Sequence, residues 1–212
     1  MLPTAGLSLD DVHMKEGAGD EVGALRLAEQ LVRRSPTDAL ARVEAGRLRL
    51  RLGERLSVAE LNLEIAVSLV PENPRAHYLL GLTQEADGRL GPAAESLRTA
   101  VALRPEFEDA AVRLGQVLMR ANDARGAVAV LSPLVKKASG PVGIRLTLST
   151  ALEQAGDVAA AEKLLVAMYK NPSTRERARL PLERFYRRHG KADAADKLVL
   201  KAARRPLKPS AR

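Results

Sequence analysis

Residues 74–107 read PRAHYLLGLTQEADGRLGPAAESLRTAVALRPEF, and they are the clearest copy of a pattern that predicts paired helices. Apolar and small residues recur at helical spacing on both sides of Asp87-Gly88, which is a turn signal. Gly81 and Ala93 are small enough to let two helices cross closely. Pro105 lies where the second helix must have ended, because proline cannot donate the next helical hydrogen bond. The stretch therefore predicts a helix, a tight turn and a second, antiparallel helix.

The same pattern recurs along the chain with a period close to 34 residues. One position is always alanine: Ala24, Ala59, Ala93, Ala127, Ala161 and Ala195. Four residues later come Ala28, Leu63, Leu97, Leu131, Leu165 and Val199, and seven residues later come Leu31, Ala66, Ala100, Leu134, Met168 and Ala202. Prolines follow twelve residues after the first three alanines, at Pro36, Pro71 and Pro105. This period predicts an array in which each helix pair packs only on its neighbours.

We expect six repeats and a basic disordered tail. The repeats fall near residues 5–38, 39–73, 74–107, 108–141, 142–175 and 176–206, and the tail covers 207–212. The expected turns are Gly19-Asp20, Gly53-Glu54, Asp87-Gly88, Asn122-Asp123, Gly156-Asp157 and His189-Gly190. The second repeat is one residue longer than the others, and we expect the extra residue in its turn, near Leu52-Gly53-Glu54.

The two terminal repeats are predicted to be irregular. The first has a short leading helix, expected over Leu9 to Lys15, with Ser8 and Asp11 at the spacing of a capping box. The last carries Pro181 inside its first helix. Irregular end repeats are typical of such arrays, because one of their faces meets water.

The chain resembles the tetratricopeptide repeat (TPR) family. The matching positions are Leu80-Gly81, Ala93, Ala100 and Pro105, whereas the aromatic positions of the family hold His77, Gln84 and Leu97. The resemblance covers nearly the whole chain, from about Ala5 to Pro206. It implies an all-α fold, a right-handed superhelical solenoid of antiparallel helix pairs.

The resemblance also implies a function, namely a non-catalytic adaptor or scaffold that captures a partner segment in a concave groove lined by the first helices. The residues expected in this groove are Arg47, Arg51, Arg75, Tyr78, Leu82, Arg113, Gln116 and Met119. Tyr78, Leu82 and Met119 are candidate apolar anchors. The arginines could pair with carboxylates of an acidic or amphipathic segment. The alternative is that the apolar residues pack on neighbouring helices and the arginines are solvated.

One known TPR binding mode is not expected. Some TPR co-chaperones hold a C-terminal carboxylate with lysine and asparagine side chains on successive first helices. The corresponding positions here are Val43, Arg47, Leu79, Val112 and Arg113. The lysine and asparagine members are missing, so the resemblance does not extend to this clamp.

Positive charge gathers at the C-terminal end. Residues 170–212 contain 14 Lys or Arg and 4 Asp or Glu, whereas residues 1–169 contain 20 and 22. The basic patch comprises Arg177, Arg184, Arg187, Arg188, Arg204 and Arg205. An acidic protein, nucleic-acid phosphates or anionic lipid could bind it, and a solvated cap is the structural alternative. Electrostatic binding of nucleic acid is therefore the rival function, although only 2% of residues are aromatic and could stack on bases.

Composition argues against an enzyme. Cysteine is absent, and His13, His77 and His189 lie in distant repeats, so no catalytic, metal or cofactor site is expected. His77 is predicted to pack between helices. No apolar run approaches the roughly 18 residues of a membrane span, and no secretory signal is evident. These features favour a cytoplasmic protein, and the Arg-, Ala- and Leu-rich composition favours a bacterial source. Self-association and a place in an envelope, motility or secretion assembly are further possibilities.

Overall fold

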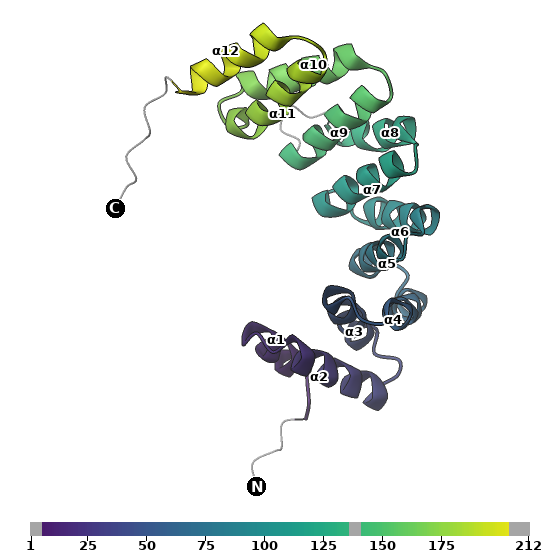
Figure 1. The fold of residues 1–212 in the computed structure, drawn as a ribbon. Helices are drawn as coiled ribbons and strands as arrows, with labels where there is room; N and C mark the ends of the chain where they lie inside the picture. Colours follow the sequence, from purple (N-terminus) through teal and green to yellow (C-terminus); the bar gives the residue numbers. More distant parts are fainter. Residues whose placement is uncertain (1–5, 136–140, 204–212) are drawn as a thin grey trace, which may run out of the picture. The chain divides into compact units, whose positions relative to one another are not determined.

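The computed structural model describes residues 6–135 and 141–203 (Figure 1). The described residues form twelve α-helices and contain no β-strand, which confirms the predicted all-α class. The chain divides into two compact units, Met1–Ala121 and Asn122–Arg212, called here the N-terminal unit and the C-terminal unit. That one continuous solenoid spans all six repeats stays a prediction.

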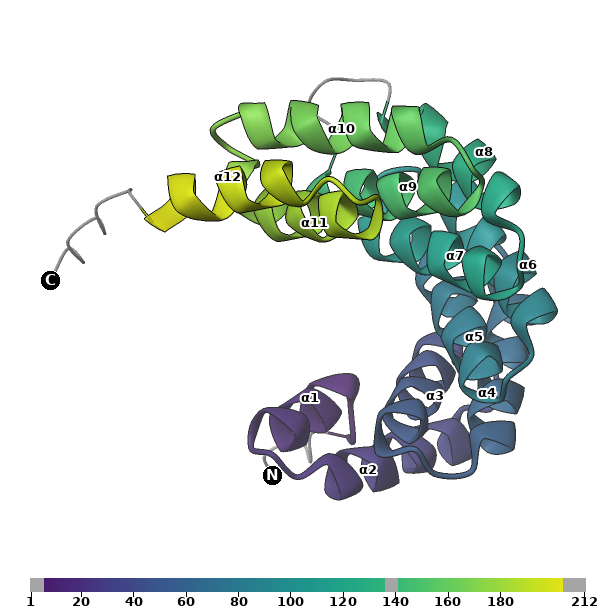
Figure 2. The ribbon, with the colours of Figure 1, turned by 45° about the horizontal axis from the view of Figure 1, so that its top comes forward.

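The N-terminal unit contains seven helices from residue 6 onward. They are α1 (Leu9–Gly17), α2 (Glu21–Arg34), α3 (Ala39–Leu52), α4 (Leu56–Leu69), α5 (Pro74–Ala86), α6 (Leu90–Leu103) and α7 (Glu108–Arg120). Successive helices contact one another, and α3 also contacts α5. Within this unit α3 and α5 lie on one side and α4 and α6 on the other (Figure 2). We call the side formed by α1, α3, α5 and α7 the first-helix face.

The C-terminal unit contains five helices within its described residues. They are α8 (Ala124–Val135), α9 (Val142–Gln154), α10 (Val158–Lys170), α11 (Arg175–Arg188) and α12 (Ala192–Ala203). Each contacts the next, and α9 also contacts α11. Pro181 lies inside α11, as predicted. Its missing N–H leaves one helical hydrogen bond unmade.

The recurring alanines form the centre of the packing. All six, from Ala24 to Ala195, have no exposed surface. Leu63, Leu97, Leu131 and Leu165, four residues further along, are at most 2% exposed. The prolines follow the second helices as expected. Helices α2, α4 and α6 each end two residues before a proline. The alanine positions that recur in the sequence are therefore buried positions in each repeat of the structure.

The six predicted turns share one backbone feature. Each holds a residue in the left-handed region: Gly19, Gly53, Gly88, Asn122, Gly156 and Gly190, with φ from 60° to 91°. Glycine and asparagine adopt this conformation at low cost, so they end the first helix and reverse the chain. At the first repeat, the amide N–H of Ser8 donates to Asp11 Oδ2 at 2.8 Å, which confirms that half of the capping box.

The extra residue of the second repeat lies in the turn, as predicted. The left-handed residues Gly53 and Gly88 end the first helices with the same backbone hydrogen bonds, Gly53 N–H to Leu50 O in one and Gly88 N–H to Glu85 O in the other. From Gly53 to the buried Ala59 there are six residues, whereas from Gly88 to Ala93 there are five. The insertion therefore follows Gly53, where Arg55 is a second left-handed residue with φ 47°.

Gly81 provides a test of the close helix crossing. A Cβ atom placed on Gly81 of α5 would lie 2.7 Å from Leu97 Cγ and 3.1 Å from the Ala93 carbonyl oxygen. We expect Gly81→Ala to lower the free energy of unfolding by about 1–3 kcal/mol, because α6 must move away. The control is Gly91→Ala in α6, where a Cβ meets nothing within 4 Å. It should be stabilising by about 0.5–1 kcal/mol. Urea unfolding measures both, and equal effects would contradict the predicted close packing.

Candidate binding face

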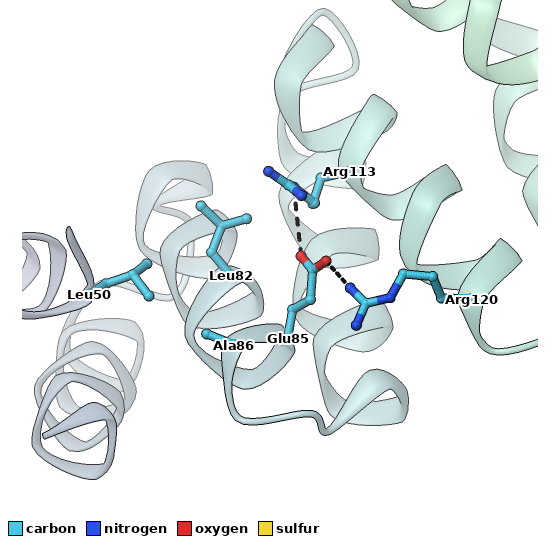
Figure 3. Close-up of a pocket in the computed structure, with 6 residues that line it drawn as sticks. All are labelled: Leu50, Leu82, Glu85, Ala86, Arg113 and Arg120. Carbon is cyan, nitrogen blue, oxygen red and sulfur yellow. Dashed lines mark hydrogen bonds and ion pairs between the residues drawn. The ribbon is translucent and has the colours of Figure 1, made fainter. Parts of the chain in front are cut away.

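A pocket of about 370 Å³ opens on the first-helix face of the N-terminal unit (Figure 3). It is lined by Leu50 of α3, by Leu82, Glu85 and Ala86 of α5, and by Arg113 and Arg120 of α7. Leu82 and Ala86 lie one helical turn apart, and Leu50 points toward them from α3. The pocket therefore has an apolar wall on one side and charged groups on the other.

Glu85 occupies the charged side of this pocket. Its carboxylate forms an ion pair with Arg120 and lies 3.6 Å from Arg113 Nε. The Glu85 side chain is only 11% exposed, whereas those of Arg113 and Arg120 are 42% and 54% exposed. Each guanidinium has five N–H donors, so one carboxylate cannot use them all. Two arginines held by one glutamate therefore leave cationic N–H groups open to solvent beside the apolar wall.

A denser ion-pair cluster surrounds Arg47 on α3. Its guanidinium donates to Glu44 Oε2 at 2.7 Å and to both carboxylate oxygens of Glu16, at 2.8 and 2.5 Å. Arg51 also reaches Glu16, at 2.6 Å, and Arg75 reaches Glu44, at 2.9 Å. The pKa of Glu16 is lowered, mainly by the hydrogen bond from Arg47. Three arginines predicted to face a partner thus pair with glutamates of the same unit.

The Arg47 cluster changes the expected role of these arginines. The side chain of Arg47 is 17% exposed and that of Glu44 is 5% exposed, whereas those of Arg51 and Arg75 are 43% and 52% exposed. Arg47 therefore joins α1 to α3, and a partner could approach only the outer edges of Arg51 and Arg75. Glu16 and Glu44 were missing from the predicted groove. Their place opposite the arginines across neighbouring helices could have been found from charge spacing.

The predicted anchor Tyr78 is half-buried on α5. Its ring lies 4.8 Å from that of Phe107, centroid to centroid, and Arg104 lies over Phe107 at 3.8 Å. Burial raises the pKa of the Tyr78 phenol, with Asp109 adding to the shift. Part of the ring is therefore used in packing on Phe107 at the end of the same repeat, and Leu82, which lines the pocket, is the better-placed anchor.

The remaining two predicted residues lie on α7. Gln116 is exposed and Met119 is half-buried. Neither lines the pocket, although Arg113 on the same helix does. The structure thus brings Leu82 and Arg113 together in the pocket and Arg47, Arg51 and Arg75 together in one ion-pair cluster.

Ion pairs recur at one position of the repeats. The sequence analysis did not predict them. Three pairs join residues 35 apart, near the ends of successive first helices: Glu16–Arg51, Glu85–Arg120 and Glu153–Arg188. Their signs alternate from repeat to repeat along the sequence. This alternation could have been found by comparing charges at the end of each first helix. Arg51, a predicted groove residue, thus pairs with a neighbouring repeat.

The basic patch of the C-terminal unit is partly neutralised. Arg188 donates to both oxygens of Glu153, at 2.8 and 2.7 Å, and Arg187 pairs with Glu183 and Asp196. Arg177 and Arg184 are exposed, with no ion pair to another described residue. Arg204 and Arg205 lie outside the described residues. The structure thus separates the described part of the patch into two paired and two unpaired arginines.

A smaller pocket of about 210 Å³ lies beside this patch. It is lined by Leu146, Ser149, Thr150, Glu153, Leu165, Pro181, Arg184 and Arg188. The hydroxyl groups of Ser149 and Thr150 both donate to the carbonyl oxygen of Leu146, so their protons are already used. The pocket has less volume than the pocket of the N-terminal unit.

The histidines take structural positions. His77 is half-buried, with Nε2 2.8 Å from the carbonyl oxygen of Pro71. His189 follows α11 and places Nε2 2.9 Å from Glu153 Oε1, and His13 lies 3.9 Å from Glu44. Among residues 6–135 and 141–203, no three His, Cys, Asp or Glu side chains gather as a metal site. No helix of this described part is long and apolar enough to cross a membrane.

The ion pair at Glu153 predicts a pH dependence. Hydrogen bonds from Arg188, with a further one from His189, outweigh burial and lower the pKa of Glu153 in the folded protein. Between that pKa and the ordinary value of 4.5, the unfolded state binds more protons than the folded state. The stabilisation is therefore present above pH 4.5 and is lost as pH falls through the folded pKa.

Urea unfolding of Glu153→Gln across this pH range measures the effect. The variant should show a shallower loss of stability in acid than the wild type. Glu64→Gln, at an exposed position, should keep the wild-type dependence. Identical curves for Glu153→Gln and wild type would contradict the stabilising ion pair.

The buried repeat positions and paired helices match a known family. Two family models described as tetratricopeptide repeat match residues 44–106 and 84–141. The chain is a tetratricopeptide repeat protein. No curated protein matched the TPR chain at the sequence level.

Similar solved structures have the same fold. A tetratricopeptide repeat protein from Parabacteroides merdae has a TM-score of 0.74 and 16% identity, over 94% of this chain and 79% of that one. MamA has a TM-score of 0.67 and 22% identity, over 76% and 88%. YrrB, a TPR protein with an unusual peptide-binding site, has a TM-score of 0.62 and 18% identity, over 82% and 90%. At these identities the likeness concerns the fold.

Proposed function

We propose that this TPR protein is a non-catalytic adaptor that captures a segment of another protein on the first-helix face of its N-terminal unit. The observation that supports this most directly is the pocket between α3, α5 and α7, in which an apolar wall adjoins partly free arginines. TPR proteins bind other proteins, and the peptide-binding site of YrrB is consistent with capture of a segment.

An apolar side chain of the partner supplies most of the affinity in this proposal. Packed against Leu50, Leu82 and Ala86, it would leave water for a surface that is already apolar. Burying one such side chain contributes about 1.5–3 kcal/mol. A pocket of 370 Å³ has room for a leucine, methionine or phenylalanine side chain.

A carboxylate of the partner supplies selectivity. It would take the solvent-facing N–H groups of Arg113 or Arg120, whose other donors hold Glu85. Exposed ion pairs contribute at most about 1 kcal/mol, so this contact matters more for the rate and direction of approach. The partner segment would therefore be amphipathic and acidic, with an Asp or Glu close to its apolar anchor.

The wider setting of the proposal follows from composition. The proposal includes a cytoplasmic location and a scaffold role within a larger bacterial assembly. Both were expected from the sequence. The Arg- and Ala-rich composition supports the bacterial source. No catalytic role is assigned.

Selection from a phage library of random twelve-residue peptides tests the proposal. Peptides retained by the wild type and rejected by Leu82→Glu should share a large apolar residue with a nearby Asp or Glu. The matched control is Leu61→Glu on α4, where Leu61 is 55% exposed and does not line the pocket. Retained peptides should bind this control normally. No enrichment, or enrichment of peptides that Leu82→Glu also retains, would contradict the proposal.

The rival function is electrostatic binding of nucleic acid by the basic patch. Exposed Arg177 and Arg184 favour it, whereas the ion pairs of Arg187 and Arg188 reduce the free charge. It predicts binding of duplex DNA or RNA that falls steeply with salt. Arg177→Ala with Arg184→Ala should weaken such binding, while Leu82→Glu should leave it unchanged. Absence of binding at low salt would end this alternative.

A further inference from the structure

The last described repeat exposes Val199 at a position that is buried in earlier repeats, together with two further apolar side chains. Val199 of α12 is 40% exposed. Its counterparts are Leu63, Leu97, Leu131 and Leu165, which are at most 2% exposed. Leu200 beside it is 57% exposed, and Leu180 on α11 is 47% exposed. Leu146, one repeat before Leu180, is half-buried against the core that includes Leu182 and Phe185.

The cause is the cover that a following repeat provides. Leu63 of α4 shares a core with Ala76, Leu79 and Leu80 of α5, which is the first helix of the next repeat. Within the described residues no helix covers α11 and α12 in this way. The exposed side chains of Leu180, Val199 and Leu200 are called here the open end. Val199 holds the position that the next first helix covers in earlier repeats.

The leading helix of the chain has a matching exposed side. Val12 and Glu16 of α1 face inward, toward the core and Arg47 respectively. Met14 lies two residues from each and so on the opposite side of the helix, where it is 66% exposed. Asp10 is also exposed, one helical turn before Met14. Helix α1 is itself a first helix, so it has the type of surface that the open end lacks.

Charge favours the same pairing. Residues 7–21, which include α1, contain five acidic residues and one basic residue. Residues 175–203, which include α11 and α12, contain nine basic and four acidic residues. Two copies meeting through their open ends would bring like charges together. One copy meeting the other through α1 would bring opposite charges together, which is favourable.

We propose that the open end binds α1 of a second copy of this chain, as a further first helix of the array. Met14 of one copy packs against Val199 and Leu200 of the other, and the exposed Asp10 of α1 lies against the exposed basic residues of α11 and α12. The contact joins two different surfaces, so copies add head to tail. It does not involve the pocket of the N-terminal unit and stands apart from the proposed adaptor function.

Sedimentation of two singly blocked variants tests this contact. Leu200→Glu places an acidic group on the open end, and Met14→Lys places a basic group on α1, so each repels the opposite surface. Both positions are exposed, so circular dichroism should show wild-type helicity. The wild type should gain mass with concentration and lose it with salt. Each variant alone should stay monomeric, and an equal mixture should associate again, because one intact surface of each kind remains.

Leu61→Glu, at an exposed position of α4, is the matched control and should associate like the wild type. Leu180→Glu provides a second block of the open end from α11 and should behave like Leu200→Glu. A wild type that stays monomeric at all concentrations and at low salt would overturn the proposal. So would a monomeric mixture of the two variants, or a Met14→Lys variant that still associates, which would indicate contact between two open ends.

Discussion

Leu82→Glu is expected to weaken binding of a selected acidic peptide by roughly 30- to 150-fold, which corresponds to about 2–3 kcal/mol. The substitution removes the central residue of the apolar wall and places a second carboxylate beside Glu85. The new charge also repels the acidic group of the peptide. Isothermal titration calorimetry at moderate salt measures the dissociation constant.

Two controls separate loss of the pocket from loss of the fold. Leu61→Glu introduces the same charge on α4 and should leave the dissociation constant unchanged. Arg113→Ala should weaken binding less than tenfold, and mainly by slowing association, because its ion pair is solvent-exposed. An Arg113→Ala effect larger than that of Leu82→Glu would mean that charge, and not the apolar anchor, dominates affinity.

Arg47→Met is expected to lower the free energy of unfolding by about 2–4 kcal/mol. Arg47 donates to Glu44, whose side chain is only 5% exposed, and to Glu16 on another helix. Without it, buried Glu44 keeps only Arg75 as a close arginine partner. Chemical unfolding measures the change, and hydrogen exchange should show faster opening of α1 and α2.

Arg51→Met is the matched control. Arg51 carries two ion pairs of similar length, to Glu16 and Glu21, but its side chain is 43% exposed. Solvent screening reduces the contribution of such pairs to less than about 1 kcal/mol. If both variants lose the same stability, the burial of Glu44 does not determine the effect.

The repeat was predictable because it rests on residue size. A small residue is needed where two helices cross closely, and alanine holds this position in all six repeats, so the pattern survives the loss of the aromatic residues of the family. The left-handed turn residues were also predictable, since few residue types adopt that backbone. The insertion of the second repeat was predictable as well, because Gly53 and the buried Ala59 are six residues apart where the corresponding pairs of other repeats are five apart.

The candidate site was predictable only in part. Leu82 and Arg113 follow from helical spacing, and the structure places both at one pocket. The same spacing cannot tell whether a groove arginine is free or paired, because that depends on a residue 31 or 35 positions away, such as Glu16 for Arg47 and Arg51. The distinction changes the interpretation: Arg47 stabilises the array, and Arg113 is the arginine better placed to meet a partner.

Site-specific photo-crosslinking in living cells of the source organism tests the adaptor proposal most directly. A photoreactive benzoylphenylalanine at Ala86, an exposed residue at the edge of the pocket, should crosslink one discrete protein. The same group at Leu61 on α4 should not. The crosslinked segment, identified by mass spectrometry, should contain a large apolar residue next to Asp or Glu. No crosslink at Ala86, or the same products at both positions, would contradict capture on the first-helix face.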